Sequence, residues 1–200
     1  ATQEEVDTAL RNLNEARNKL KKPNTEPVLA TFSSFNKEYT AAAGNWLYNT
    51  TLYADWSRAD QAPVDLEGDR TGLYLIMNMS FDAPEGTDLS QCWESTTIKL
   101  RSVDKNGENN YGWVLRPDSE EVIATDTPGE FKIAIPLTKK QDNSKGTMDW
   151  GEVERVITTT MISGVGDYRV LAGRSDLTMT LSDTQIVDSN IFDLEGWING

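Results

Sequence analysis

The sequence contains no histidine and only one cysteine, Cys92, in 200 residues. The missing histidine excludes Ser-His-Asp and Cys-His catalysis, a histidine general base and most zinc and iron sites. A single cysteine excludes an intramolecular disulfide, a cysteine zinc cluster and a redox pair. Because no histidine can act as its base, we expect Cys92 to be a buried, inert thiol.

Long apolar runs and excess positive charge are also missing. No apolar segment approaches the roughly 20 residues that span a bilayer. The formal net charge is −13, and such a surface repels phosphate backbones and anionic lipid headgroups. We therefore expect neither nucleic acid nor a membrane as a partner. Acidic, cysteine-poor chains are common among surface proteins of Gram-positive bacteria, which favours a secreted or cell-surface location.

The first 20 or so residues predict one amphipathic helix, from residue 3 to about residue 21. Thr2 and Glu5 have the spacing of a capping box, and Pro23 ends the helix. Apolar residues recur at steps of three and four, at Val6, Ala9, Leu10, Leu13, Ala16 and Leu20. A single helix cannot bury this stripe alone. It therefore docks on the following domain or has lost partner helices upstream.

The segment 1–23, ATQEEVDTALRNLNEARNKLKKP, resembles the last helix of a FIVAR-type repeat. Such repeats are small helical spacer domains of large Gram-positive surface proteins, often beside carbohydrate-binding modules. The resemblance implies that the chain was cut from a longer, multi-domain extracellular protein. The other domains of that parent chain would then be its partners.

From Pro27 onward the apolar period changes to two, which is typical of strands with one buried face. The alternation is clearest at 73–81 and recurs at 98–100, 131–135 and 177–181. It slips at Ile186, which predicts a bulge near Ser182–Thr184. Further strands are expected near residues 28–35, 46–56, 111–116, 155–162 and 168–172.

Turn signals such as Asn106-Gly107 and Pro128-Gly129 separate these short strands. Many short strands without repeated helices predict a mostly β fold, an antiparallel β-sandwich. We assign this domain to residues 27–189. Residues 190–200, which contain Trp197, are expected to be a C-terminal tail, a linker or the start of another domain.

The order of elements in this domain is similar to that of the galactose-binding-like jelly rolls used by many carbohydrate-binding modules. The residues that carry the resemblance are Val64-Asp65-Leu66, the strand 73–81, Trp93, Ile98–Ser102, Gly112-Trp113, the strand 131–136, Asp149-Trp150 and Ile186-Val187-Asp188. The resemblance implies a helical turn at 149–153. It also implies a non-catalytic module that targets a larger extracellular protein or enzyme to a polysaccharide or glycan.

Outward-facing aromatic and basic residues are the candidate ligand-binding residues. Lys99 and Arg101 alternate with Ile98 and Leu100, and Trp93 shares their parity if the strand runs unbroken. An aromatic ring stacks on the CH groups of a sugar, and cations donate hydrogen bonds to hydroxyls or pair with uronates. The candidate set is Trp56, Trp93, Lys99, Arg101, Tyr111, Trp113 and Arg116. In the alternative interpretation the tryptophans fill the core and the cations form a solvated strand face.

The sequence requires no cofactor, but it leaves open whether the domain binds a structural calcium ion. Asp65, Glu67 and Asp69 alternate, yet Gly68 between them does not match an EF-hand loop. Related jelly rolls often hold calcium near the first loop and the last strand, where Asp183 and Asp188 lie. The calcium ligands cannot be named from the sequence.

Three functions compete, and a carbohydrate-binding module is preferred. An adhesin or structural spacer domain of a bacterial surface protein is the alternative. A small jelly-roll glycoside hydrolase would need two carboxylates facing each other across a cleft. The acidic residues instead cluster in expected turns and helices, so we expect no enzymatic activity.

Overall fold

The computed structural model describes residues 2–20, 25–34, 42–43, 49–57, 62–82, 85–86, 88–90, 92–102, 112–140, 148–163 and 178–200. This part of the chain is mostly β and carries one N-terminal helix. The elements are α1 (Gln3–Leu20), β1 (Val28–Ser34), β2 (Ala42–Ala43), β3 (Asn49–Ser57), β4 (Leu73–Asp82), the 3-10 helix η1 (Cys92–Ser95), β5 (Thr96–Ser102), β6 (Trp113–Leu115), the 3-10 helix η2 (Ser119–Glu121), β7 (Val122–Ala124), β8 (Glu130–Pro136), β9 (Val153–Ser163), β10 (Thr178–Asp188) and α2 (Leu194–Asn199).

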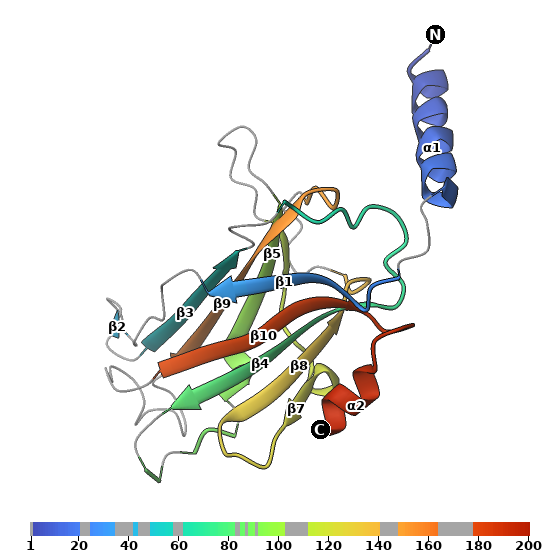
Figure 1. The fold of residues 1–200 in the computed structure, drawn as a ribbon. Helices are drawn as coiled ribbons and strands as arrows, with labels where there is room; N and C mark the ends of the chain where they lie inside the picture. The colour runs from blue at the N-terminus through green and yellow to red at the C-terminus, as the bar shows by residue number, and fades with distance from the viewer. Residues whose placement is uncertain are drawn as a thin grey trace.

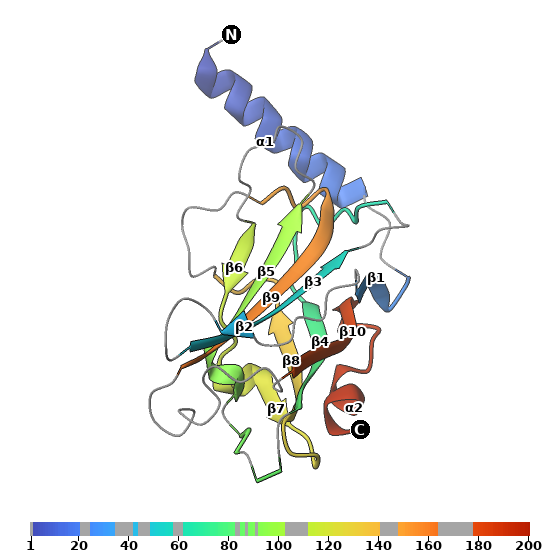
Figure 2. The same cartoon turned by 90° about the vertical axis from the view of Figure 1, so that its left-hand side faces the viewer.

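The strands pair antiparallel in the order β6-β5-β9-β3-β1-β10-β4-β8-β7, with β2 paired to β3. β1 belongs to both halves of this order: residues 28–32 pair with β10, and Ser33 and Ser34 pair with β3. We call β1, β10, β4, β8 and β7 sheet A, and β6, β5, β9, β3 and the end of β1 sheet B. Figures 1 and 2 show the two groups of strands as two layers. The arrangement is compatible with a β-sandwich.

The main hydrophobic core draws on both sheets. Alternate residues of β4 and β5 are buried, because one side chain in two points inward along a strand. Sheet A contributes Leu75, Met77, Ile133, Ile135 and Leu181, and sheet B contributes Ile98, Leu100, Leu115, Val153 and Val156. The strand predicted at 73–81 is thus confirmed, and its odd-numbered residues face this core.

The bulge predicted in the last strand is confirmed. The register between β10 and β4 shifts between Ser182 and Gln185. Asp183 lies in this interval with a φ of 48°, a left-handed conformation that aspartate adopts more readily than most residues. The extra residue returns Ile186 to the core face, where it is fully buried.

Residues 190–200, expected to be a tail or linker, lie against the outer face of sheet A. Asp193 caps α2 by accepting a hydrogen bond from the Gly196 amide. Phe192, Leu194 and Trp197 pack on a second cluster of buried residues, Ile76, Ala134 and Val187. This cluster explains why Ile76 and Val187 are buried although they point away from the main core. The short helix is therefore part of the folded domain (Figure 1).

The N-terminal helix was predicted at 3–21 and is found at Gln3–Leu20. Its capping box is formed: the Thr2 amide donates to Glu5 Oε2 at 2.7 Å, and the Glu5 amide donates to Thr2 Oγ1 at 3.3 Å. Figures 1 and 2 show α1 projecting from the strands. Val6, Leu10 and Leu13 are 50%, 56% and 65% exposed, so this part of the apolar stripe is not buried on the sandwich. No helix in the described part of the chain is long and apolar enough to cross a membrane.

Deleting residues 1–22 is expected to leave the melting temperature nearly unchanged. The physical reason is that the exposed Val6, Leu10 and Leu13 add little apolar burial to the sandwich. Thermal unfolding followed by circular dichroism compares the truncated and full chains. A loss of several kcal/mol in the free energy of unfolding would show that α1 belongs to the core of the domain.

Candidate ligand-binding site

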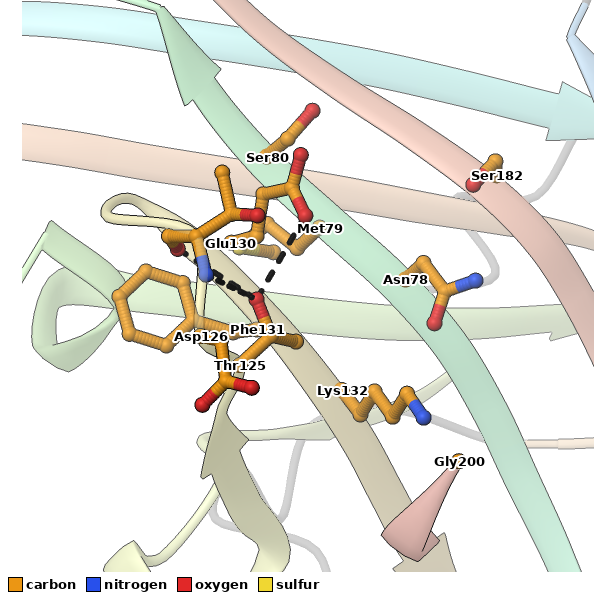
Figure 3. Close-up of a pocket in the computed structure, with 11 residues that line it drawn as sticks. Asn78, Met79, Ser80, Thr125, Asp126, Glu130, Phe131, Lys132, Ser182 and Gly200 are labelled. Carbon is orange, nitrogen blue, oxygen red and sulfur yellow. Dashed lines mark hydrogen bonds between the residues drawn. The ribbon is translucent and has the colours of Figure 1, made fainter. Parts of the chain in front are cut away.

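A polar pocket of about 420 Å³ lies on the outer face of sheet A. It is lined by residues of β4, β8, β10, the turn after β7 and Gly200 (Figure 3). The lining residues are Asn78, Met79, Ser80, Thr125, Asp126, Thr127, Glu130, Phe131, Lys132, Ser182 and Gly200. We call this site the sheet-A pocket.

The strand register gathers the polar side chains of this pocket. Asn78 lies opposite Lys132 on β8 and opposite Ser182 on β10, and Ser80 lies opposite Glu130. Side chains directly opposite in an antiparallel pair lie on the same face of the sheet. Their neighbours in sequence, Met79 and Phe131, pack in the main core, so the polar residues face outward. The outer face of β4 therefore changes from apolar under α2 to polar in the pocket.

Asn78 is held in place by the bulge of β10. Its Nδ2 donates to Asp183 Oδ2 at 2.8 Å. This hydrogen bond fixes the amide plane, and its Oδ1 is buried without a hydrogen-bond partner among the described residues. A buried acceptor without a partner costs about 1–3 kcal/mol. A ligand that donates a hydrogen bond to this atom would remove that cost.

Lys132 joins the pocket to the C-terminal helix. Its Nζ donates to the Trp197 carbonyl at 2.6 Å and lies 3.5 Å from the Ile198 carbonyl. The same ammonium lies 5.6 Å from the centre of the Trp197 ring, within the range of a cation–π interaction. A cation near the last carbonyls of a helix is favourable, so Lys132 is engaged by α2.

The hairpin between β7 and β8 forms the other wall, where Thr125 and Asp126 lie across the pocket from Asn78 and Lys132 (Figure 3). Thr125 Oγ1 accepts from the Thr127 amide at 3.2 Å and lies 3.5 Å from Glu130 Oε2. Gly129 closes the turn with a φ of 81°, and a Cβ atom there would lie 2.9 Å from the Phe81 carbonyl oxygen. This wall of the pocket is thus a tight turn that packs closely against β4 at Phe81.

The prediction that Trp113 faces outward is wrong. Trp113 is 4% exposed and belongs to the main core. Its Nε1 donates to the Lys139 carbonyl at 3.0 Å, and its ring meets that of Trp150 edge to face at 5.8 Å. It is buried because β6 pairs with β5 so that Trp113 lies opposite Leu100, a core residue. Trp150, expected in the core, does pack against it.

Trp93 does not extend the row of Lys99 and Arg101. The 3-10 helix η1 precedes β5, so the strand does not run unbroken to Trp93, and its half-buried side chain packs against the main core. Lys99 and Arg101 do lie on the outer face of β5, both half-buried. Arg101 lies opposite Arg155 of β9. The structure therefore brings basic residues together on the outer face of sheet B, but the expected indole of Trp93 does not join them.

The remaining predicted residues are placed in part. The exposed Arg116 follows β6, and its carbonyl accepts from Lys139 Nζ at 2.9 Å. Burial lowers the pKa of Lys139, but Asp118 and Glu121 more than offset this and leave the pKa raised. The backbone of Trp56 lies opposite Val156, a core residue, while the Trp56 side chain and all of Tyr111 lie outside the described residues. The expected strand at 168–172 also lies outside them.

The residues of the sheet-A pocket were missed because their meeting is non-local. Alternation with Met79 and Phe131 already places Asn78, Ser80, Glu130 and Lys132 on the outward face. Only the pairing of β4 with β8 and β10 brings them together. The only signal in the sequence was a pair of polar residues on either side of an apolar strand residue. Any solvent-exposed strand face shows the same pattern.

Cys92 is the one cysteine of the chain, and its side chain is buried. Burial, with a smaller contribution from Asp88, raises the pKa of the Cys92 thiol to about 12, so it stays protonated at neutral pH. The expectation of a buried thiol is confirmed. Among the described residues, no group of three or more His, Cys, Asp or Glu side chains is placed to hold a metal ion.

Three of the acidic residues considered for calcium accept local hydrogen bonds. Asp65 accepts from the Glu67 amide and Asp69 from the Thr71 amide. The backbone hydrogen bond from Thr71 lowers the pKa of Asp69. Asp188 accepts two hydrogen bonds from Asn190.

Comparison with protein-family models, with curated proteins and with solved structures finds no match to this chain.

Proposed function

We propose that this chain is a non-catalytic carbohydrate-binding module with a galactose-binding-like jelly-roll fold, and that the glycan binds in the sheet-A pocket. The observation that carries the proposal is the pocket itself. Amide, hydroxyl, carboxylate and ammonium groups line it, most of them on three paired strands. Groups that hydrogen-bond hydroxyls from rigid strands are what a sugar ring requires for orientation.

The pocket takes the place of the aromatic and basic set that was expected around Lys99 and Arg101. Trp113 is buried in the core and offers no ring face to a sugar, and the half-buried Trp93 packs against the core. The polar pocket needs no stacked ring, because the hydrogen bonds supply orientation. Lys99 and Arg101 remain available on sheet B for a second mode of contact with a long chain.

Binding without hydrolysis agrees with the placement of the carboxylates. Glycoside hydrolysis needs two carboxyl groups on opposite sides of the scissile bond, one with a raised pKa. Asp126 and Glu130 of the pocket both come from one hairpin. The pKa values of Asp69 and Asp88 are lowered by backbone hydrogen bonds from Thr71 and Ser90, the direction opposite to that of a general acid.

The exposed helix α1 supports a module within a larger extracellular protein. Its apolar stripe at Val6, Leu10 and Leu13 is uncovered in the described structure. A helix with such a stripe is stabilised when neighbouring helices cover it. In this proposal α1 connects the module to a preceding helical domain of the parent chain, and the module brings that chain to a glycan.

An Asn78→Ala substitution is expected to weaken glycan binding about tenfold or more while the fold stays intact. The variant loses the hydrogen bond to Asp183, which lowers the free energy of unfolding. It also removes the buried, unpartnered Oδ1 acceptor, which raises the free energy of unfolding, so the two effects oppose each other. The loss of one or two ligand hydrogen bonds corresponds to about 1.5 kcal/mol or more. A glycan array selects the ligand, and calorimetry measures its affinity.

Thr138→Ala is the matched control, because Thr138 is exposed in the turn at the far end of β8. It should bind like the original chain. A reducing-sugar assay on the same samples should show no hydrolysis. If Asn78→Ala folds and binds normally, the pocket is not the site; if no glycan on the array binds, an adhesin or spacer role replaces the proposal.

A further inference from the structure

We infer that the glycan unit in the sheet-A pocket carries a protonated amine, as an amino sugar without its N-acetyl group does. The inference rests on the proposed function and names the substrate class of the same site. It follows from the balance of hydrogen-bond donors and acceptors among the residues that line the pocket.

The charges of the pocket favour a cation. Two carboxylates, Asp126 and Glu130, face one ammonium, that of Lys132. Lys132 is already engaged, because it donates to the Trp197 carbonyl at 2.6 Å and lies against the Trp197 ring. The positive charge is thus held at the edge beside α2, which leaves the hairpin wall with an excess of negative charge.

Several acceptors of the pocket have free hydrogen-bonding capacity. Asn78 Oδ1 is buried and has no partner in the described structure. Glu130 receives one long contact, 3.5 Å from Thr125 Oγ1, and a carboxylate can accept about four hydrogen bonds. Asp126 is exposed at the hairpin tip. A ligand with donors can use these acceptors, and a protonated amine brings three donors with a positive charge.

The same inventory disfavours the related sugars. An N-acetyl group removes the charge and replaces two of the three donors by a carbon and a carbonyl acceptor. A uronate places a carboxylate against Asp126 and Glu130, and like charges at close range repel each other. A neutral sugar can still use its hydroxyls as donors to Asn78 and Glu130. The expected order of affinity is amino sugar, then neutral sugar, then uronate.

The test compares oligomers of glucosamine, N-acetylglucosamine, glucose and galacturonic acid by calorimetry at low and moderate salt. The glucosamine oligomer is expected to bind at least tenfold more tightly than its acetylated counterpart, with the ratio falling as salt rises. Glu130→Gln and Asp126→Asn should lower glucosamine affinity about three- to tenfold and change glucose affinity less. Both substitutions are nearly isosteric at exposed positions, so folding is preserved.

Equal or tighter binding of the N-acetylated oligomer would overturn the inference and leave the proposed function standing. Binding of the galacturonate oligomer that is lost in Lys99→Gln and Arg101→Gln would move the site to sheet B and overturn it as well. If none of the four oligomers and no other glycan binds, the proposed function itself is wrong, and the inference is wrong with it.

Discussion

Replacing Trp113 by alanine is expected to lower the free energy of unfolding by about 3–5 kcal/mol. The indole is 4% exposed, packs edge to face on Trp150 with ring centres 5.8 Å apart, and donates to the Lys139 carbonyl at 3.0 Å. Alanine leaves a cavity between β6 and the main core, and the Lys139 carbonyl loses its partner. Urea unfolding, followed by far-ultraviolet circular dichroism of the backbone, measures the change in the free energy of unfolding.

Trp113→Phe separates the two contributions. Phenylalanine keeps most of the apolar volume but cannot donate to the Lys139 carbonyl, so the expected loss is about 1–2 kcal/mol. Trp93→Ala, at a half-buried position on the edge of the core, should cost less than Trp113→Ala. A folded Trp113→Ala chain that loses less than about 1 kcal/mol would contradict the burial of this side chain.

Replacing Gly112 by alanine is expected to cost about 3 kcal/mol or more. Gly112 has a φ of 64° and precedes β6. A Cβ atom there would lie 2.1 Å from the Leu100 carbonyl oxygen and 3.1 Å from Arg101 Cγ. The first contact is with backbone, so β6 must move away from β5. The pairing of β6 with β5 would then be lost in part, together with the burial of Trp113.

Gly86→Ala is the control for the backbone conformation alone. Gly86 has a φ of 83°, but nothing lies within 4 Å of a Cβ atom at that position. Its substitution should cost only the left-handed conformation of an alanine, about 1–2 kcal/mol. Thermal and urea unfolding of both variants measure the difference. Equal losses for the two glycines would show that the close approach of Gly112 to β5 is absent in solution.

The periodicity of the sequence was enough to predict most of the described strands, but it missed the short strands β2 and β7 and did not predict how the strands pair. Alternation along 73–81 and the slip at Ile186 predicted β4 and the β10 bulge, because burial of one face constrains every second residue. The capping pattern of Thr2 and Glu5 likewise predicted the start of α1. These features depend on residues a few positions apart.

Features that depend on distant residues were not predictable in this way. Tryptophan is a residue type that often stacks on sugars, so Trp113 was a candidate for binding. Only the pairing of β6 with β5 shows that its side chain is buried. The packing of Trp197 could not be predicted from the sequence, because Ile76 and Val187, on which it packs, belong to other strands. The pocket combines Asn78 with Lys132 and Ser182 through the sheet register. Such a meeting has no local signature.

The proposed glycan-binding site lies on the outer face of sheet A. Backbone amide chemical shifts, followed by NMR during titration with the tightest ligand from the array, test it most directly. We expect the largest changes at the pocket residues Asn78, Ser80, Thr125, Glu130 and Lys132, and we expect these changes to saturate together. Changes centred on Lys99 and Arg101 of β5, with the sheet-A pocket unchanged, would contradict it.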